Sequence, residues 1–385
     1  MTLAVSLLGV ALFVGIVAER FVIPSSVALL LAGIAGGALW SGGRAISFGS
    51  VLLLVLLPPL LFEAAYSLDV PSLRRGWKAI ALLAVPGVVF TAGAIGLACV
   101  ATQALDLTGA LLLGAIVAAT DPVAVVAVFR KVGVPVELAT LVEGESIAND
   151  GTTLLLFQVF LALEAANART TLVPTILHAA LLAPLGGAAI GFALARVVAL
   201  SLRGTTSRSL MILGTVFTAY GSYLIADRFG LSGIFATATA ALALRVVESF
   251  PGDVETSLEI DRLWSAIAVV ADAFVFLLAG VNLQVGRIAH EPLVVFAALI
   301  ALAASRAALA YGALPLLGIL DLKPSWRHVV ALSGIRGALS LALALSLPDD
   351  VPGRATIVDV VFAVVVVTLV VQGLAVRPIL SRLRL

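Results

Sequence analysis

Residues 138–163 read LATLVEGESIANDGTTLLLFQVFLAL, which is long enough to cross a bilayer as a helix. The flanks of this segment are mostly apolar, but its centre, residues 144–150, holds two carboxylates, a hydroxyl and a carboxamide in the order GESIAND. Polar and ionisable groups at such depth are costly unless they face a partner or a water-filled cavity. The segment therefore predicts a membrane helix with a functional site in it, and an ion or proton site is the first hypothesis.

The composition of the whole chain supports a membrane protein. Of 385 residues, 62% are hydrophobic and only 12% are charged, and the mean hydropathy is +1.18. Soluble globular domains lie far from these values. The net charge of +1 gives no support for nucleic acid or an acidic molecule as a partner, and the single cysteine, Cys99, allows neither a disulfide framework nor a cysteine-based metal site.

Thirteen apolar segments follow one another along the chain, separated by charged or Pro/Gly-rich joints. Their approximate ranges are 2–18, 25–41, 48–67, 79–101, 107–129, 138–163, 171–200, 209–226, 230–246, 263–283, 291–320, 328–348 and 355–379. None alternates like a barrel strand, so each predicts a transmembrane helix. The expected fold is an all-α polytopic membrane protein, with the whole of 1–385 as one transport domain and no soluble domain.

The basic residues predict the orientation of the chain. With thirteen spans and the N-terminus outside, the cytoplasmic joints carry sixteen of the 23 Lys and Arg residues and the outer joints carry five. Short cytoplasmic loops are enriched in Lys and Arg. We therefore expect a multi-pass protein of the cell inner membrane with its N-terminus outside and its C-terminus in the cytoplasm.

Two of the predicted spans contain residues that should interrupt a helix. The fifth holds residues 119–122 (ATDP), in which the proline removes a backbone donor, and the twelfth holds residues 333–337 (SGIRG), with glycines on both sides of an arginine. These spans are in equivalent positions if spans 1–6 and 8–13 are two inverted six-helix repeats. Paired interrupted helices indicate the binding site of an alternating-access carrier.

The spacing of the polar residues in 144–150 separates two pairs. On a helix, Ser146 and Asp150 share one face, while Glu145 and Asn149 share a second face about 100° away. A hydroxyl and a carboxylate are hard oxygen ligands suited to a hard cation. A carboxylate removed from water also binds a proton readily, since burial disfavours its charged form. Asp150 can thus hold either a cation or a proton.

Other charged residues lie within the predicted spans and need partners there. Glu145 requires compensation in the membrane, and Arg306 is the more helix-embedded of two arginines, so we expect an ion pair between them. Asp121 is a candidate ligand or, alternatively, a group that compensates exposed backbone at the break. Three more charged residues within the spans that we single out are Glu63, Asp272 and Arg336.

Four motifs in register resemble one known family. They are LPP at 57–59 ahead of Glu63, TDP at 120–122, GESxxND at 144–150 and GIRGA at 334–338. Together they resemble the monovalent cation/proton antiporter family, which includes NhaP-type sodium/proton antiporters and sodium/proton exchangers. The resemblance extends over essentially the whole chain.

The resemblance implies roles for residues that match the family's motifs. Asp150 corresponds to the ion- and proton-binding aspartate, Ser146 and Glu63 correspond to cation ligands, and Thr120 would offer its main-chain carbonyl. A Na⁺ ion would then lie among these four residues. Asp121 would stabilise the site or reach the ion through water.

Further implications concern the surroundings of that site. Asn149 matches the asparagine of electroneutral members, Glu145 and Arg306 match a buried ion pair, and Arg336 matches the arginine of the interrupted twelfth helix. The family implies a homodimer. A core bundle of roughly 79–163 and 291–379 would move against a dimerisation part of roughly 1–67 and 171–283.

The sequence thus predicts a secondary active transporter, and not an enzyme, that exchanges Na⁺ (or Li⁺) for H⁺ one to one and serves pH homeostasis without a cofactor. A K⁺/H⁺ antiporter or a cation channel remains an alternative, because similar oxygens would serve either. A non-transporting membrane sensor is weaker, and an organic-anion carrier is disfavoured because the intramembrane acids outnumber the arginines. No nucleotide-binding motif supports ATP-driven pumping.

Overall fold

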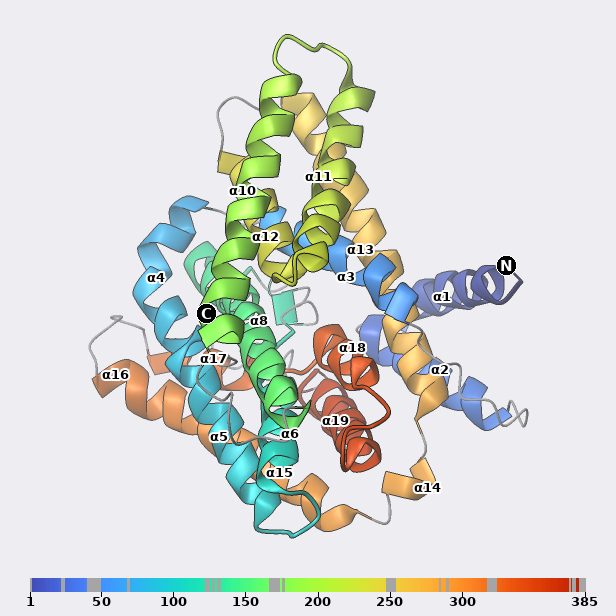
Figure 1. The fold of residues 1–385 in the computed structure, drawn as a ribbon. Helices are drawn as coiled ribbons and strands as arrows, with labels where there is room; N and C mark the ends of the chain where they lie inside the picture. Colours follow the sequence, from blue (N-terminus) through green and yellow to red (C-terminus); the bar gives the residue numbers. More distant parts are fainter. Residues whose placement is uncertain are drawn as a thin grey trace. The chain divides into compact units, whose positions relative to one another are not determined.

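The chain folds entirely into helices and turns, with no β-strand in the ranges described below (Figure 1). The computed structural model describes residues 2–21, 25–39, 50–67, 70–121, 125–126, 129, 133–165, 174, 177–246, 254–283, 285–288, 291–316, 324–373, 375 and 379–380. Parts of the predicted spans, including residues 122–124 and 171–173, lie outside these ranges.

The helices follow in this order: α1 (Thr2–Phe21), α2 (Ser25–Leu39), α3 (Ser50–Tyr66), α4 (Val70–Ala84), α5 (Pro86–Val100), α6 (Leu107–Ala118), α8 (Val136–Ala165), η1 (His178–Leu182), α10 (Ala183–Ser201), α11 (Arg208–Arg228), α12 (Gly233–Val246), α13 (Val254–Asn282), α14 (Val285–Ile288), α15 (Pro292–Ala307), η2 (Ala308–Ala313), α16 (Leu314–Leu316), α17 (Pro324–Leu332), α18 (Ala338–Ser346), α19 (Arg354–Val367) and η3 (Thr368–Gln372). The η elements are π-helical turns.

The helices match the predicted membrane segments. Seven helices in the described ranges are long and apolar enough to cross a membrane, and five more are apolar but shorter. Each of the thirteen predicted segments overlaps at least one described helix. The all-α polytopic fold expected from the sequence is confirmed.

The chain divides into two compact units. The first comprises Met1–Phe48, Pro71–Ala168 and Ala273–Leu385, and the second comprises Gly49–Val70 and Arg169–Asp272. The division into a moving core bundle and a dimerisation part concerns motion and assembly, and it stays a prediction.

In the first unit, helices α5, α6, α8 and α15 form a packed group, with α18 and α19 against α6. The α6 helix begins at a capping residue, because the Asp106 carboxylate accepts a hydrogen bond from the Gly109 amide at 3.1 Å. Gly114 of α6 faces the Ala92 backbone of α5 so closely that a Cβ would overlap it. Small residues let these two helices approach each other, as in other membrane bundles.

In the second unit, α10, α11 and α12 pack together and α3 packs against α11 and α12. Gly187 and Gly191 of α10 lie against the carbonyls of Ser232 and Ala236, where side chains would not fit. Small residues four positions apart are typical of close helix packing, and this pair is used in that way.

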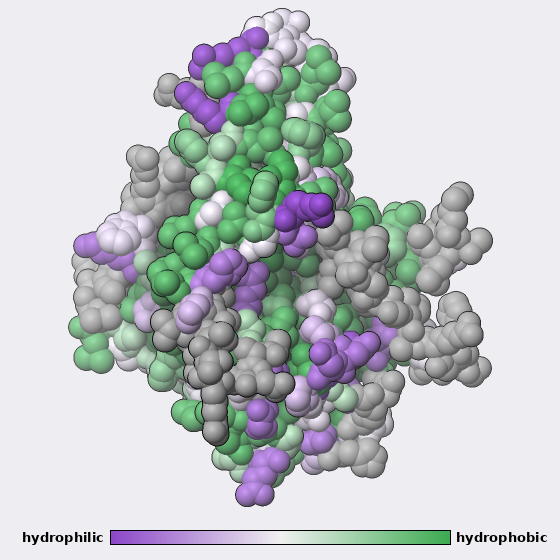
Figure 2. Space-filling view, viewed as in Figure 1, coloured by the Kyte–Doolittle hydropathy of each residue, from purple (hydrophilic) through white to green (hydrophobic). Residues whose placement is uncertain are grey.

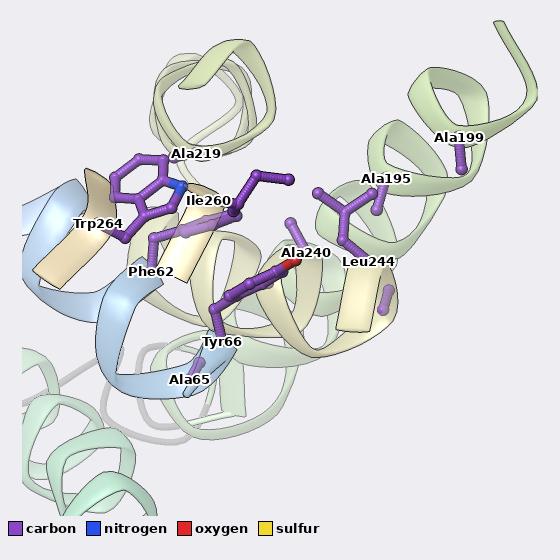
Figure 3. Packing of buried hydrophobic residues seen from close by; sticks show 12 residues of the cluster. Phe62, Ala65, Tyr66, Ala195, Ala199, Ala219, Ala240, Leu244, Ile260 and Trp264 are labelled. Carbon is purple, nitrogen blue, oxygen red and sulfur yellow. The ribbon is translucent and has the colours of Figure 1, made fainter. Parts of the chain in front are cut away.

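An aromatic cluster fixes the C-terminal half of α3 in the second unit. The Phe62 ring lies 4.3 Å from the Trp264 ring and 5.6 Å from the Tyr66 ring, centroid to centroid, and the three side chains are buried (Figure 3). Aromatic pairs at such separations add to the free energy gained by burial. Glu63 therefore lies between two buried aromatic residues of α3, Phe62 and Tyr66, whose packing fixes this turn.

Large apolar side chains point outward from the helices of the second unit. On α10 and α11 they include Leu185, Phe192, Leu213 and Phe217, each more than half exposed. Figure 2 shows this apolar surface over α10 and α11. Lipid tails are as apolar as leucine, so such a surface suits helices that face a bilayer.

Candidate functional site

Both predicted interruptions of the membrane helices are confirmed. The α6 helix ends at Ala118, and Ala119 takes an extended conformation with φ −57° and ψ 139°. The chain is also non-helical over residues 334–337, between the end of α17 and the start of α18. Proline at 122 and glycines at 334 and 337 explain why the helices stop there.

The polar residues of α8 hold the first interruption. The Ser146 hydroxyl donates to the Thr120 carbonyl at 2.6 Å, and the Asn149 carboxamide nitrogen donates to the Thr120 hydroxyl at 2.6 Å. The Thr120 amide in turn points at the Asn149 carboxamide oxygen, at 3.4 Å. All three side chains are buried. Backbone groups that the break would leave unsatisfied in the membrane are thereby bound.

Asp150 lies one turn along α8 from Ser146. Its Oδ1 atom is buried, and within the described ranges it has no hydrogen-bond partner. Asp121 is near enough to act on the Asp150 carboxylate electrostatically. A buried carboxylate oxygen without a donor beside it is suited to bind a cation or a proton.

The two interruptions meet each other. The Asp121 amide donates to the Ile335 carbonyl at 2.8 Å, which joins the non-helical residues of both breaks through their backbones. The Asp121 carboxylate also accepts from the Ala338 amide, at 3.4 Å, where α18 begins. A negative charge at a helix N-terminus is stabilised by the helix dipole. Asp121 therefore serves the second break as well as lying beside Asp150.

Arg306 holds the other side of the second interruption. It forms an ion pair with Glu145 of α8, in which its two terminal nitrogens bind the two carboxylate oxygens. Its Nε donates to the Val330 carbonyl at 2.9 Å, and Nη2 also donates to the Ser333 hydroxyl at 3.2 Å. A positive charge near the last carbonyls of α17 complements that end of the helix dipole. The pair expected from the sequence is thus present, and it also caps α17.

Arg336 is buried in the second interruption, with 1% of its surface exposed. Its amide donates to the Thr368 hydroxyl at 3.2 Å. Its Nε and Nη1 atoms have no hydrogen-bond partner among the described residues, although Glu145 and Arg306 both lie within electrostatic range. The guanidinium thus adds a positive charge to the part of the unit that holds Asp121 and Asp150.

Glu63 belongs to α3, in the second unit, and is partly exposed. Its part in a cation site stays a prediction. Asp272 is half-buried on α13.

Several polar residues that hold the breaks were not singled out from the sequence. Thr368 binds the Arg336 amide, Ser333 binds Arg306, and the Ser340 hydroxyl donates to the Ile116 carbonyl at 2.8 Å. Asp359 is a further buried acid, on α19. Serine and threonine are common in membrane helices, so only their position opposite a break distinguishes these ones. Asp359 could have been found as an acid within the thirteenth apolar segment.

Comparison with known proteins identifies the family. A family model described as "Sodium/hydrogen exchanger, transmembrane" matches residues 8–382. The Na⁺/H⁺ antiporter ApNhaP of Aphanothece halophytica is 34% identical over 371 residues, which cover 94% of this chain and 70% of that protein. The Na⁺/H⁺ antiporter NhaG of Bacillus atrophaeus is 32% identical, over 87% of this chain and 64% of that protein.

The fold is also found among solved structures. The sodium proton antiporter MjNhaP1 from Methanocaldococcus jannaschii aligns with a TM-score of 0.79 at 22% identity, over 97% of this chain and 99% of that one. This likeness concerns the fold, including a polytopic arrangement of helices. With a family model that matches nearly its whole length, the chain belongs to the sodium/hydrogen exchanger family.

Proposed function

We propose that the chain is a secondary active antiporter that exchanges Na⁺ (or Li⁺) for H⁺, one for one, with Asp150 binding the two ions in turn. One observation carries the proposal: the buried Oδ1 of Asp150 has no partner in the described ranges and lies one turn from Ser146, next to two helix breaks that are hydrogen-bonded to each other. Family membership supports a transporter of ions that uses no cofactor, and not an enzyme.

Competition for one carboxylate would couple the two ions. When Asp150 holds Na⁺ or H⁺ its charge is neutralised, and the site can cross the membrane interior. When it is empty, an unpaired carboxylate must move through a medium of low dielectric constant, which is costly. Crossing while empty is therefore rare, and each Na⁺ must be exchanged for a proton.

The ligands we propose for the cation are Asp150, the Ser146 hydroxyl, the Thr120 carbonyl and Glu63. In the structure the Ser146 hydroxyl donates to the Thr120 carbonyl at 2.6 Å, so both oxygens already lie together. To bind the ion, the Ser146 hydroxyl would rotate its hydrogen away from the Thr120 carbonyl, so that both oxygens face the cation. Glu63 is included from the resemblance of its motif.

Asn149 supports the one-for-one stoichiometry. Its carboxamide binds Thr120 through both ends, and it carries no charge. Asp150 would then be the one group of the pair that changes its protonation during the cycle. We propose exchange without net charge movement on this basis.

The assembly and orientation are proposed with the function. The chain would form a homodimer in the cell inner membrane and serve pH homeostasis, with the core bundle moving against the dimerisation part. The distribution of Lys and Arg supports an outer N-terminus and a cytoplasmic C-terminus. A reporter fused after Leu385 that reacted with an impermeant reagent from outside would contradict this orientation.

The test is Na⁺-driven proton movement in proteoliposomes with Asp150→Asn. The variant keeps the size of the side chain and removes the charge, so exchange should fall to the level of empty vesicles. Asp350→Asn is the control, because it makes the same change at an exposed position. Exchange by Asp150→Asn at the wild-type rate would overturn the proposal.

The same vesicles test the alternatives. Na⁺, Li⁺ and K⁺ are supplied side by side, and the proposal expects Na⁺ and Li⁺ to dissipate an imposed pH gradient. Dissipation by K⁺ alone would indicate a K⁺/H⁺ antiporter, and flux that fails to saturate would indicate a channel. The relatives are named Na⁺/H⁺ antiporters, which does not favour either alternative.

A further inference from the structure

The α3 helix contains two consecutive prolines in its interior, Pro58 and Pro59. In an α-helix each amide donates to the carbonyl four residues earlier. Pro59 has no N–H, so the Val55 carbonyl lacks its helical donor. Within a membrane an unsatisfied carbonyl is more costly than in water.

A side chain from another helix binds this carbonyl. The Tyr220 hydroxyl of α11 donates to the Val55 carbonyl at 3.0 Å, although the two residues are 165 positions apart in sequence. Both belong to the second unit, in which α3 packs against α11. The phenol thus stands in place of the amide that Pro59 lacks.

The α11 helix is also linked to the C-terminal half of α3, through Trp264. The Trp264 indole nitrogen donates to the Thr215 hydroxyl of α11 at 3.0 Å, and Trp264 packs on Phe62 (Figure 3). The α3 helix is therefore bound to α11 directly before the proline pair and, through Trp264 of α13, indirectly after it. Glu63 directly follows Phe62 and lies one turn after Pro59.

We propose that Tyr220 is a positioning residue for Glu63. Its hydrogen bond to the Val55 carbonyl fixes the proline-containing turn of α3 and so sets where the Glu63 carboxylate is presented. The inference rests on the proposed function, in which Glu63 is a cation ligand. It predicts that loss of the hydroxyl weakens Na⁺ binding while the maximal exchange rate is largely kept.

The proline offers a sharp test, because replacing it restores the missing donor. In Pro59→Ala the new amide can donate to the Val55 carbonyl, and the Tyr220 hydroxyl is no longer needed. Four proteins are compared in proteoliposomes: wild type, Tyr220→Phe, Pro59→Ala and the double variant. The half-saturating Na⁺ concentration, the maximal exchange rate and the unfolding temperature are measured for each.

Tyr220→Phe should raise the half-saturating Na⁺ concentration about threefold to tenfold, the factor expected for one lost hydrogen bond. The maximal rate should stay within about twofold. On the Pro59→Ala background the same change should have no further effect on Na⁺. Tyr223→Phe, on the same helix, is the matched control and should behave like wild type.

The inference would be overturned if Tyr220→Phe raised the half-saturating Na⁺ concentration equally in the wild type and in Pro59→Ala. It would also be overturned if Tyr220→Phe alone left that concentration at the wild-type value. If Tyr220→Phe does not fold, folding of the double variant supports the inference and its failure to fold overturns it. Wild-type vesicles that exchange no Na⁺ for H⁺ would overturn the proposed function, and the inference with it. If the wild type exchanges Na⁺ for H⁺ but the effects of Tyr220→Phe and Pro59→Ala simply add, the inference is overturned and the proposed function stands.

Discussion

At the scale of single residues, the ion pair of Glu145 and Arg306 places two opposite charges in the interior of the first unit. Both side chains are buried, and the guanidinium also binds the Val330 carbonyl and the Ser333 hydroxyl. Two charges taken out of water are offset only when their geometry is good and their other hydrogen bonds are made. Arg306 meets both conditions and joins three helices.

Arg306→Met should lower the stability of the protein by about 3–5 kcal/mol, because it leaves the Glu145 carboxylate buried without its partner. The measurement is thermal unfolding of purified protein in detergent. The double variant Glu145→Gln with Arg306→Met should recover part of the loss, since the unpaired charge is gone.

Arg208→Gln serves as a comparison for this prediction. Arg208 pairs with Glu255 at 2.5 Å, but the two side chains are 39% and 67% exposed. An exposed pair contributes at most about 1 kcal/mol. A loss for Arg306→Met no larger than for Arg208→Gln would show that the buried pair is not a structural requirement.

The contacts of these polar residues could be predicted from the sequence only in part. Two arginines within the predicted spans left few partners for Glu145, so the pair with Arg306 could be inferred. The helical spacing put Ser146 and Asn149 on different faces, yet both bind Thr120. Thr120 can serve both because α6 has already unwound there, and the path of an unwound segment depends on the other break.

At the scale of elements, the two interrupted helices form one arrangement with charges matched to their ends. Asp121 lies at the start of α18 and Arg306 lies at the end of α17. Each charge complements the partial charge of the helix end that it contacts. The breaks, which proline and glycine make possible, are thereby stabilised by groups from other helices.

Gly337→Ala should disrupt this arrangement. A Cβ at Gly337 would overlap the Asp121 carboxylate, so Asp121 would have to leave the start of α18. Overpacking of this kind costs about 1–3 kcal/mol, and here it also moves a charge next to Asp150. We expect a lower unfolding temperature and a loss of most Na⁺/H⁺ exchange in proteoliposomes.

Gly93→Ala is the control for this substitution, because a Cβ there meets nothing within 4 Å. It should leave both the unfolding temperature and the exchange rate near the wild-type values. Retention of full exchange by Gly337→Ala would mean that the contact between Asp121 and α18 is dispensable.

The π-helical turns show where sequence patterns stop being informative. Arg306 lies just before η2, and Thr368, which binds the Arg336 amide, begins η3. Such turns occur often at functional sites. Their residues, ALAYGA and TLVVQ, are ordinary for a membrane helix, so nothing in them distinguishes a widened turn from a regular one. Tertiary contacts decide the local geometry here.

At the scale of the whole molecule, the order and approximate positions of the apolar helices could be predicted, because hydropathy and segment length indicate them. The boundaries were less certain. The fourth predicted segment begins at 79, whereas α4 begins at Val70 and Pro86 starts a separate helix, α5. The pairing of helices within each unit, such as α10 with α12, depends on contacts between distant residues and has no local signal.

The exchange cycle as a whole predicts how acidity acts on transport. In the proposed cycle protons and Na⁺ compete for Asp150, so lowering the pH should raise the half-saturating Na⁺ concentration and leave the maximal rate unchanged at saturating Na⁺. Where the carboxylate is mostly protonated, the increase should be about tenfold for each pH unit. The measurement is initial Na⁺ uptake into proteoliposomes at a series of pH values.

This pH dependence separates competition from independent sites. If protons bound elsewhere, acid would lower the maximal rate and leave the half-saturating concentration constant. That outcome would contradict a single shared carboxylate, even if Asp150→Asn were inactive.

The hydrogen bond from the Asp121 amide to the Ile335 carbonyl has a consequence for how the protein would exchange its amide hydrogens with deuterated water. Non-helical segments usually exchange quickly, since their amides are open to solvent. This amide is bound across two breaks, so it should exchange as slowly as those of the surrounding helices. Rapid labelling at Asp121 would therefore report separation of the two breaks, even while every helix stays intact.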